Sequence, residues 1–159
     1  ADSSKRLKLT DVEDTRFLHC NIKTLNLLVN VMAAEKAESM GCGECVFHRG
    51  DVVTECAHSN VSIIKDGIFK THPTDHYILP GITRMHIIQI CKDNGIPVDE
   101  TPFTMADLMD ADEIIVSSST KFCSPACEMN GTPIGGKAPE LVKLIQEKYM
   151  EKFENETAN

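Results

Sequence analysis

Residues 44–71 decide the fold class, and they read ECVFHRGDVVTECAHSNVSIIKDGIFKT. Within this stretch, short apolar runs occur in pairs on either side of turn residues: residues 45–48 and 52–54 around Arg49-Gly50-Asp51, and residues 61–65 and 68–71 around Asp66-Gly67. A glycine between such runs adopts the positive φ that tight turns require, and Asp-Gly is among the strongest short hairpin signals. The stretch therefore predicts two successive β-hairpins.

Helical patterns lie on both sides of these hairpins. In residues 25–40, apolar side chains recur every three or four positions as far as Gly41, which predicts a helix with one face on the core. The apolar members of that face are Leu25, Leu28, Val29, Met32 and Ala33. Residues 81–93 are apolar nearly all round, which predicts a largely buried helix, and residues 140–153 predict a charged amphipathic helix.

The remaining segments predict further strands and one short helix. Strand patterns occupy residues 9–17, 98–101 and 113–118, and a last pair of strands turns at Asn130-Gly131. Thr104, with Asp107 three positions later, predicts a capped helix that runs through Met109. Hairpins outnumber strand–helix–strand crossovers. We therefore predict an α+β fold with a largely antiparallel sheet or pseudo-barrel flanked by helices.

Size and composition narrow the function classes. The chain has 159 residues, which suits one domain with its own core. Its formal net charge of −8, with no basic stripe among aromatic residues, argues against nucleic-acid binding. No apolar run approaches the roughly 18 residues of a membrane span, and we expect neither a membrane partner nor a signal peptide. Seven scattered cysteines are typical of reduced thiols, so we expect a cytoplasmic protein.

Four pieces of the sequence suit a cofactor that carries both a phosphate and a carbonyl group. Lys23 lies in a polar break before the first helix, and a lysine amine can form a Schiff base with an aldehyde. Glu55 lies at a strand end, where its carboxylate could keep a pyridinium nitrogen protonated. The helix start at residues 81–83 and the hydroxyl run at residues 117–120 offer N–H groups and hydroxyls to a phosphate.

Each of these pieces also has an ordinary explanation. A lysine before a helix and a glutamate at a strand end are normally solvated surface charges. A helix start is commonly a plain capped terminus, and serine-rich loops are common. The cysteines offer a different site, since two closely spaced pairs could supply four thiolates to a structural zinc ion: Cys42 with Cys45, and Cys123 with Cys127.

Read together, these residues resemble the C-terminal large domain of the fold-type IV pyridoxal-phosphate enzymes, the class-IV aminotransferase family, and most closely its D-amino acid aminotransferases. The resemblance keeps the family's order and spacing over residues 9–153. Nine segments carry it: residues 16–28 (RFLHCNIKTLNLL), 48–55 (HRGDVVTE), 59–61 (SNV), 65–67 (KDG), 71–73 (THP), 78–84 (ILPGITR), 95–98 (GIPV), 102–104 (PFT) and 118–120 (SST).

The resemblance implies pyridoxal 5′-phosphate as cofactor, no metal, and D-amino acids and 2-oxo acids as substrates. It implies that Lys23 is the Schiff-base lysine, which also moves the proton between substrate Cα and cofactor C4′, and that Glu55 pairs with the pyridine nitrogen. Further cofactor-binding residues follow from it: Arg16 near the phenolic oxygen or phosphate, His58 and Ser59 after the glutamate, Leu79 behind the ring, and Ile82, Thr83, Ser118 and Ser119 around the phosphate.

The chain departs from the family's pattern in two places. After its glutamate the family has Gly-Ser-Ser-Ser-Asn, whereas residues 56–60 read CAHSN, so we expect altered hydrogen bonding at His58 and an altered substrate range. The family also has an N-terminal domain of comparable size. We therefore expect residues 9–153 to be the C-terminal domain alone, with a linker end at 1–8 and a tail at 154–159.

Further expectations follow if the chain is the C-terminal domain alone. The isolated domain should be inactive, the full-length enzyme should be a homodimer, and the uncovered docking side should leave an apolar patch that promotes association. Within the same fold, a branched-chain aminotransferase or an aminodeoxychorismate lyase would use the same lysine and glutamate. From another class, a non-catalytic, zinc-stabilised binding domain remains as an alternative.

Overall fold

The computed structural model describes residues 6–16, 27–74, 81–118 and 122–158, and only the backbone of Leu27 and of residues 153–158. In chain order the elements are β1 (Leu7–Glu13), α1 (Leu27–Ser39), β2 (Glu44–Arg49), β3 (Val52–Cys56), β4 (Asn60–Lys65), β5 (Ile68–Thr71), α2 (Ile82–Asp93), β6 (Val98–Asp99), α3 (Met105–Asp110), β7 (Glu113–Ser117), β8 (Ser124–Met129), β9 (Thr132–Pro133) and α4 (Pro139–Ala158).

The strands form one mixed sheet in the order β3-β2-β1-β8-β7-β4-β5-β6, with β9 paired to β8. β1 runs parallel to both of its neighbours, β2 and β8, and β5 runs parallel to β6. The other pairs are antiparallel. The predicted α+β fold is confirmed. The sheet is more mixed than expected because the parallel partners of β1 follow it only after long stretches of chain, for which no local turn signal exists.

The predicted hairpins are present. β2 and β3 turn at Gly50, whose φ is +57°. β4 and β5 turn at Asp66 and Gly67, where φ is +53° and +77°, as a tight hairpin with two left-handed central residues requires. The turn from β8 to β9 at Asn130-Gly131 uses positive φ at both residues as well.

The sheet curls into a half-barrel whose outer edge at β3 is closed by the chain before α3. The Val53 N–H donates to the Phe103 carbonyl at 2.9 Å, and the Met105 N–H donates to the Asp51 carbonyl at 2.8 Å. Thr104 caps α3 in a reciprocal box with Asp107, as predicted. The concave side buries a core drawn from most strands of the sheet, which includes Leu9, Val46, Val61, Ile114 and Phe103.

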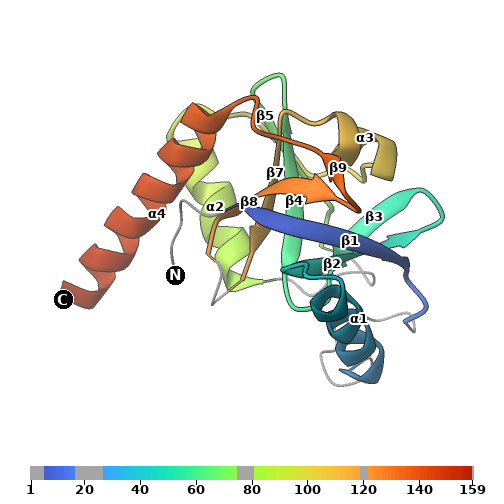
Figure 1. Cartoon of the computed structure of the whole chain (residues 1–159). Coiled ribbons are helices and arrows are strands. Elements are labelled where there is room, and N and C mark those ends of the chain that lie inside the picture. The colour runs from blue at the N-terminus through green and yellow to red at the C-terminus, as the bar shows by residue number, and fades with distance from the viewer. Residues whose placement is uncertain (1–5, 17–26, 75–80, 119–121, 159) are drawn as a thin grey trace.

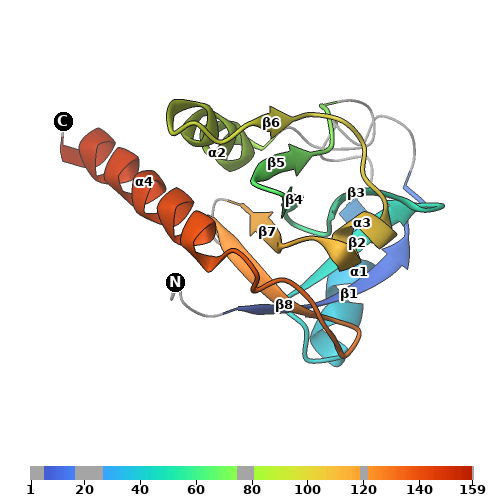
Figure 2. The ribbon, with the colours of Figure 1, turned by 90° about the horizontal axis from the view of Figure 1, so that it is seen from above.

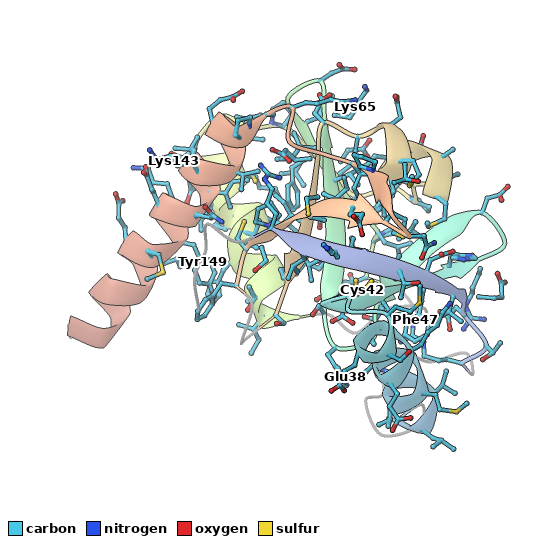
Figure 3. All side chains as sticks on the ribbon, viewed as in Figure 1. Glu38, Cys42, Phe47, Lys65, Lys143 and Tyr149 are labelled. Atoms are coloured by element: carbon cyan, nitrogen blue, oxygen red, sulfur yellow. The ribbon has the colours of Figure 1, made fainter. Side chains whose placement is uncertain are left out.

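Helices cover the convex side in two places (Figures 1 and 2). α1 lies over β2, where Ala33 and Ala37 pack against Cys45 and Phe47. α2 and α4 lie together at the other end of the sheet, and their side chains pack on β4, β5 and β7. Tyr149 of α4 points toward α2 and meets His86 edge-on, with ring centroids 6.3 Å apart (Figure 3).

Several predicted boundaries were wrong. β1 begins at Leu7 and ends at Glu13, so residues 7–8 of the predicted linker are strand and residues 14–16 of the predicted strand are not. Residue 17 lies outside the described residues. β6 stops at Asp99. α4 continues to Ala158, so residues 154–158 are helical rather than a frayed tail. No helix among the described residues combines the length and apolarity that a membrane crossing needs.

The buried faces of two helices also differ from the prediction. On α1, Leu28 is 72% and Met32 61% exposed, because α1 turns its small residues Ala33 and Ala37 to the sheet. On α2, Ile82 is 71% exposed and Met85 58%, so α2 is amphipathic rather than buried all round. The predicted face of α1 is therefore confirmed only in part: Val29 and Ala33 do pack against the cluster that contains Cys45 and Phe47, whereas Leu28 and Met32 do not. Leu25, also predicted on this face, lies outside the described residues.

Candidate functional site

A buried cluster of charges joins the end of β1 to the end of β3. Arg16 lies just beyond β1, and its Nη1 donates to Glu55 Oε1 at 2.5 Å. The same guanidinium holds Asp14 with two side-chain bonds, from Nε to Oδ1 and from Nη2 to Oδ2, each 2.9 Å long. All three residues are at most 5% exposed. Arg16, predicted to face the cofactor, thus also compensates the charge of Glu55.

The surroundings of the cluster keep its charges in place. Burial favours the neutral form of Asp14, but the hydrogen bonds and charge of Arg16 outweigh it and hold the pKa of Asp14 below its usual value. Thr54 donates to Asp14 Oδ2 at 3.0 Å, and the Phe47 ring lies 4.3 Å from Arg16 Cζ. Burial alone would lower the pKa of Arg16, but its two carboxylates raise it, so the guanidinium stays charged.

Asn60, at the start of β4, connects this cluster to the start of α2. Its Nδ2 lies 3.4 Å from Glu55 Oε2. Its Oδ1 occupies the space that a Cβ on Gly81 would need, so the Asn60 side chain approaches the N-terminus of α2 as closely as a glycine permits. Asn60 also pairs with Ser117 at the end of β7. The ends of β3, β7 and α2 therefore meet around one asparagine.

Three of the predicted phosphate-binding residues, Ile82, Thr83 and Ser118, lie near this meeting point. α2 opens with Gly81 as its N-cap, and its first turn contains no acidic residue. The first N–H groups of a helix have no partner within the helix, and its N-terminus carries the positive end of the dipole. The Thr83 side chain is buried whereas that of Ile82 is exposed. Ser118 follows β7 directly, and its carbonyl accepts from the Phe122 N–H at 2.8 Å.

The connection between β3 and β4 is organised by a residue that the sequence did not single out. Glu44, at the start of β2, accepts hydrogen bonds from Ser59 Oγ at 2.9 Å and from the Ala57 N–H at 3.1 Å. The His58 N–H lies 3.4 Å from Glu44 Oε2, the oxygen that Ser59 also contacts, while the His58 side chain is exposed. The predicted cofactor residue Ser59 is thus bonded to Glu44.

The structure places part of the predicted site and leaves part undescribed. Arg16, Glu55, Thr83 and Ser118 are described, and Asn60 brings the last three to one end of the sheet. Lys23, Leu79 and Ser119 lie outside the described residues. Asp14, Glu44 and Asn60 were not among the residues predicted from the sequence. Asn60 stood in the SNV segment, which was a usable signal, whereas no spacing in the sequence relates Glu44 to Ser59.

The zinc alternative is not supported. Cys45 packs under α1 and Cys123 packs under α2 and α4, in separate hydrophobic clusters. Burial raises the pKa of Cys45 to about 11 and that of Cys123 to about 12, so without a metal ion both are thiols at neutral pH. Among the described residues no group of three or more histidine, cysteine or acidic side chains is placed to hold a metal ion.

Comparison with known proteins identifies relatives over most of the chain. The family model "Amino-transferase class IV" matches residues 2–129. A D-alanine aminotransferase of Listeria monocytogenes serotype 4b is 49% identical over 136 residues, which are 84% of this chain and 47% of that protein. A D-alanine aminotransferase of Staphylococcus haemolyticus is 46% identical over 154 residues, covering 94% of this chain and 55% of that protein.

The fold has solved counterparts. The branched-chain amino acid aminotransferase of Escherichia coli superposes with a TM-score of 0.83 at 27% identity, over 92% of this chain and 51% of that one. The chain spans about half the length of the curated relatives that it matches. The half-barrel with its helices thus matches the C-terminal domain of class IV aminotransferase structures, which is the fold that the resemblance predicted. The chain belongs to the class IV aminotransferase family.

Proposed function

We propose that this chain is the cofactor-binding part of a pyridoxal-phosphate-dependent aminotransferase that moves amino groups between D-amino acids and 2-oxo acids. The D-amino acid specificity is supported by the D-alanine aminotransferases that are 46–49% identical. The observation that carries the proposal is the position of Glu55: a buried carboxylate, fixed by Arg16, that Asn60 connects to the N-terminus of α2.

The described residues fit pyridoxal phosphate. A protonated ring nitrogen needs a fixed anion, and Glu55 is a buried carboxylate held by Arg16 and contacted by Asn60. A phosphate needs N–H donors and positive potential, and the first turn of α2 supplies both without an acidic residue to oppose them. When bound, the cofactor supplies an electron-withdrawing ring and an aldehyde.

The chain's own residues have separate tasks in this proposal. Glu55 holds the ring nitrogen, and Arg16 and Asp14 keep Glu55 from turning away. The N–H groups of Ile82 and Thr83, with the hydroxyls of Ser118 and Ser119, bind the phosphate. Leu79 would be the apolar residue behind the ring. Lys23 would supply the amine that holds the cofactor, and the same amine would take up and return the proton of the substrate's α-carbon.

Two further parts of the proposal concern the whole enzyme. We infer a cytoplasmic homodimer, because the buried cysteines are thiols and because an exposed apolar face remains on α1, where Leu28 and Met32 lie on one side. Amino acid and 2-oxo acid substrates are its small-molecule partners. The half of the relatives' length that this chain does not match is where we expect the substrate carboxylate to be held.

Reductive labelling tests the cofactor site directly. The chain is incubated with pyridoxal phosphate, reduced with borohydride and mapped by mass spectrometry. Labelling confined to Lys23 is expected, and Lys23→Ala should abolish it. Lys36, which donates to the Asp11 carbonyl, is a matched control lysine whose replacement by alanine should leave the label in place. Label spread evenly over the surface lysines would contradict the site.

Substrate choice is tested on a full-length form of the enzyme. D-alanine with 2-oxoglutarate should react faster than L-leucine with the same acceptor. Faster reaction of L-leucine would favour the branched-chain alternative. This chain is similar in fold to the branched-chain amino acid aminotransferase of E. coli. Turnover of aminodeoxychorismate would favour the lyase.

A further inference from the structure

Glu44 is a buried carboxylate that the proposed reaction does not use. It is the first residue of β2 and is only 2% exposed. Four donors converge on it. The N–H groups of Cys45 and Ala57 contact Oε1 at 3.0 and 3.1 Å, while Ser59 Oγ and the His58 N–H contact Oε2 at 2.9 and 3.4 Å.

Three of those donors belong to the connection between β3 and β4. This connection is only residues 57–59, and it is closed by a bond from the Cys56 N–H to the Ser59 carbonyl at 2.8 Å. From the other side, α1 contributes Asn30, whose Nδ2 donates to the Ala57 carbonyl at 2.8 Å. The connection is therefore held by β2 and α1 together.

The connection sets the position of two site residues. Glu55 lies two residues before it and Asn60 directly after it, and these two side chains contact each other. A shift of the 57–59 turn must therefore move the carboxylate that faces the proposed ring nitrogen relative to the asparagine that contacts α2.

We propose that Glu44 is a positioning residue: it fixes the 57–59 turn and thereby the mutual placement of Glu55 and Asn60 in the cofactor site. This inference rests on the proposed function for its consequence in cofactor binding, but the fixing of the turn itself does not. The chemistry is specific to a carboxylate. A glutamine would present N–H donors at one end to donors that need an acceptor, and a buried donor left without an acceptor is destabilising.

The test compares Glu44→Gln, Glu44→Asp and Ser59→Ala with Glu38→Gln, a control on the exposed side of α1 (Figure 3). Amide hydrogen exchange is measured by NMR at Ala57 and His58. We expect Glu44→Gln to accelerate exchange there by at least about tenfold, the loss expected for a charged hydrogen bond, while amides of β7 stay protected. Glu44→Asp should recover part of the protection, and Glu38→Gln should change nothing.

The cofactor readout is the binding constant and absorbance maximum of added pyridoxal phosphate. If Glu55 is misplaced, Glu44→Gln should bind pyridoxal phosphate about tenfold more weakly and should shift its absorbance maximum. Glu44→Asp should largely restore both values. Equal loss of protection throughout the chain would show a merely structural role and overturn the proposal, as would unchanged exchange at Ala57 and His58. If Glu44→Gln does not fold, Ser59→Ala, which removes one donor, must also accelerate amide exchange at Ala57 and His58, but by a smaller factor.

The two proposals fail in different ways. If the unsubstituted chain does not bind pyridoxal phosphate, the proposed function fails in this chain, and the exchange data still decide whether Glu44 fixes the turn. If the unsubstituted chain binds the cofactor and Glu44→Gln loosens the turn with unchanged binding and absorbance, the positioning role is refuted while the function stands.

Discussion

Arg16 and Glu55 form a buried ion pair, with Nη1 and Oε1 2.5 Å apart, between the chain that follows β1 and the end of β3. Because the other edge of the Arg16 guanidinium holds Asp14, one arginine compensates two carboxylates. A planar guanidinium can serve both at once, whereas an ammonium is a single point of charge. The predicted site therefore depends on a residue that must be an arginine.

Replacing Arg16 should destabilise the fold strongly. Arg16→Met leaves Asp14 and Glu55 buried without their cation, which costs about 3–5 kcal/mol of unfolding free energy by analogy with other broken buried pairs. Arg16→Lys should recover only part of this, since it restores charge without the two-sided geometry. Urea unfolding measures both. Lys143→Gln on the exposed side of α4 should stay within about 0.5 kcal/mol, and an Arg16→Met chain as stable as that control would contradict the pairing.

The stability that Asp14 contributes should disappear in acid. Its folded-state pKa lies below the unfolded value of about 3.9, because the bonds from Arg16 outweigh the effect of burial. A carboxylate with a lowered folded pKa stabilises the fold above the unfolded pKa and loses that contribution as the pH falls through the folded pKa.

Asp14→Asn should therefore be less stable than the unsubstituted chain by about 2 kcal/mol at pH 7, and the difference should shrink steadily below about pH 4. Urea unfolding at pH 7, 5, 4 and 3 gives the difference at each pH. Asp51→Asn, in the exposed turn between β2 and β3, is the control that shows the effect of the same substitution at the surface. If the difference in unfolding free energy between Asp14→Asn and the unsubstituted chain did not change with pH, the ionised carboxylate of Asp14 would not be the source of the stability.

Sequence patterns predicted the local parts of this molecule and missed those that depend on distant contacts. The hairpin at Asp66-Gly67 and the capping box at Thr104 are confirmed because turn and cap chemistry act within four residues. The parallel pairs of β1 and the exposed position of Leu28 were not predictable in the same way, since both depend on where segments far apart in the chain pack.

In the candidate site, too, the residues marked by a local pattern were predicted and the others were not. Glu55 and the start of α2 were found because each lies at the end of an element with a clear pattern. Glu44 was not found, because the Ala57, His58 and Ser59 groups that it holds lie more than ten positions away, as in the 2.9 Å contact from Ser59 Oγ to Glu44. Asp14 was missed although Arg16 is only two positions away, because no pattern in the sequence marks that pair as buried beside Thr54 and Glu55. A resemblance in order and spacing located the segments, but it carried no information on which side chain compensates which charge.

Gly81→Ala should weaken the site by steric conflict rather than by backbone strain. Gly81 has a φ of −71°, which any residue adopts, but the new Cβ would collide with Asn60 Oδ1. Overpacking of this kind costs about 1–3 kcal/mol. Thermal unfolding should show the loss, and Asn60→Ala should relieve part of it in the double variant.

Gly43→Ala is the matched control for this prediction. Its Cβ would also be close to another atom, Leu7 Cδ2 at 2.9 Å, but that atom is the end of a flexible side chain that can move. Gly43→Ala should therefore cost less than Gly81→Ala and should not couple to Asn60. Additive effects of Gly81→Ala and Asn60→Ala would contradict the proposed collision.

The exposed face of α1 should make the chain associate. Leu28 and Met32 lie one turn apart and are 72% and 61% exposed, and Val31 beside them is 40% exposed. Contiguous apolar surface of this kind tends to be covered by another molecule. Sedimentation velocity should show a mean mass that rises with concentration, and Leu28→Gln with Met32→Gln should lower it. Met150→Gln, at an exposed methionine on α4, should leave the association intact, and a chain that stays monomeric at high concentration would show that α1 needs no cover.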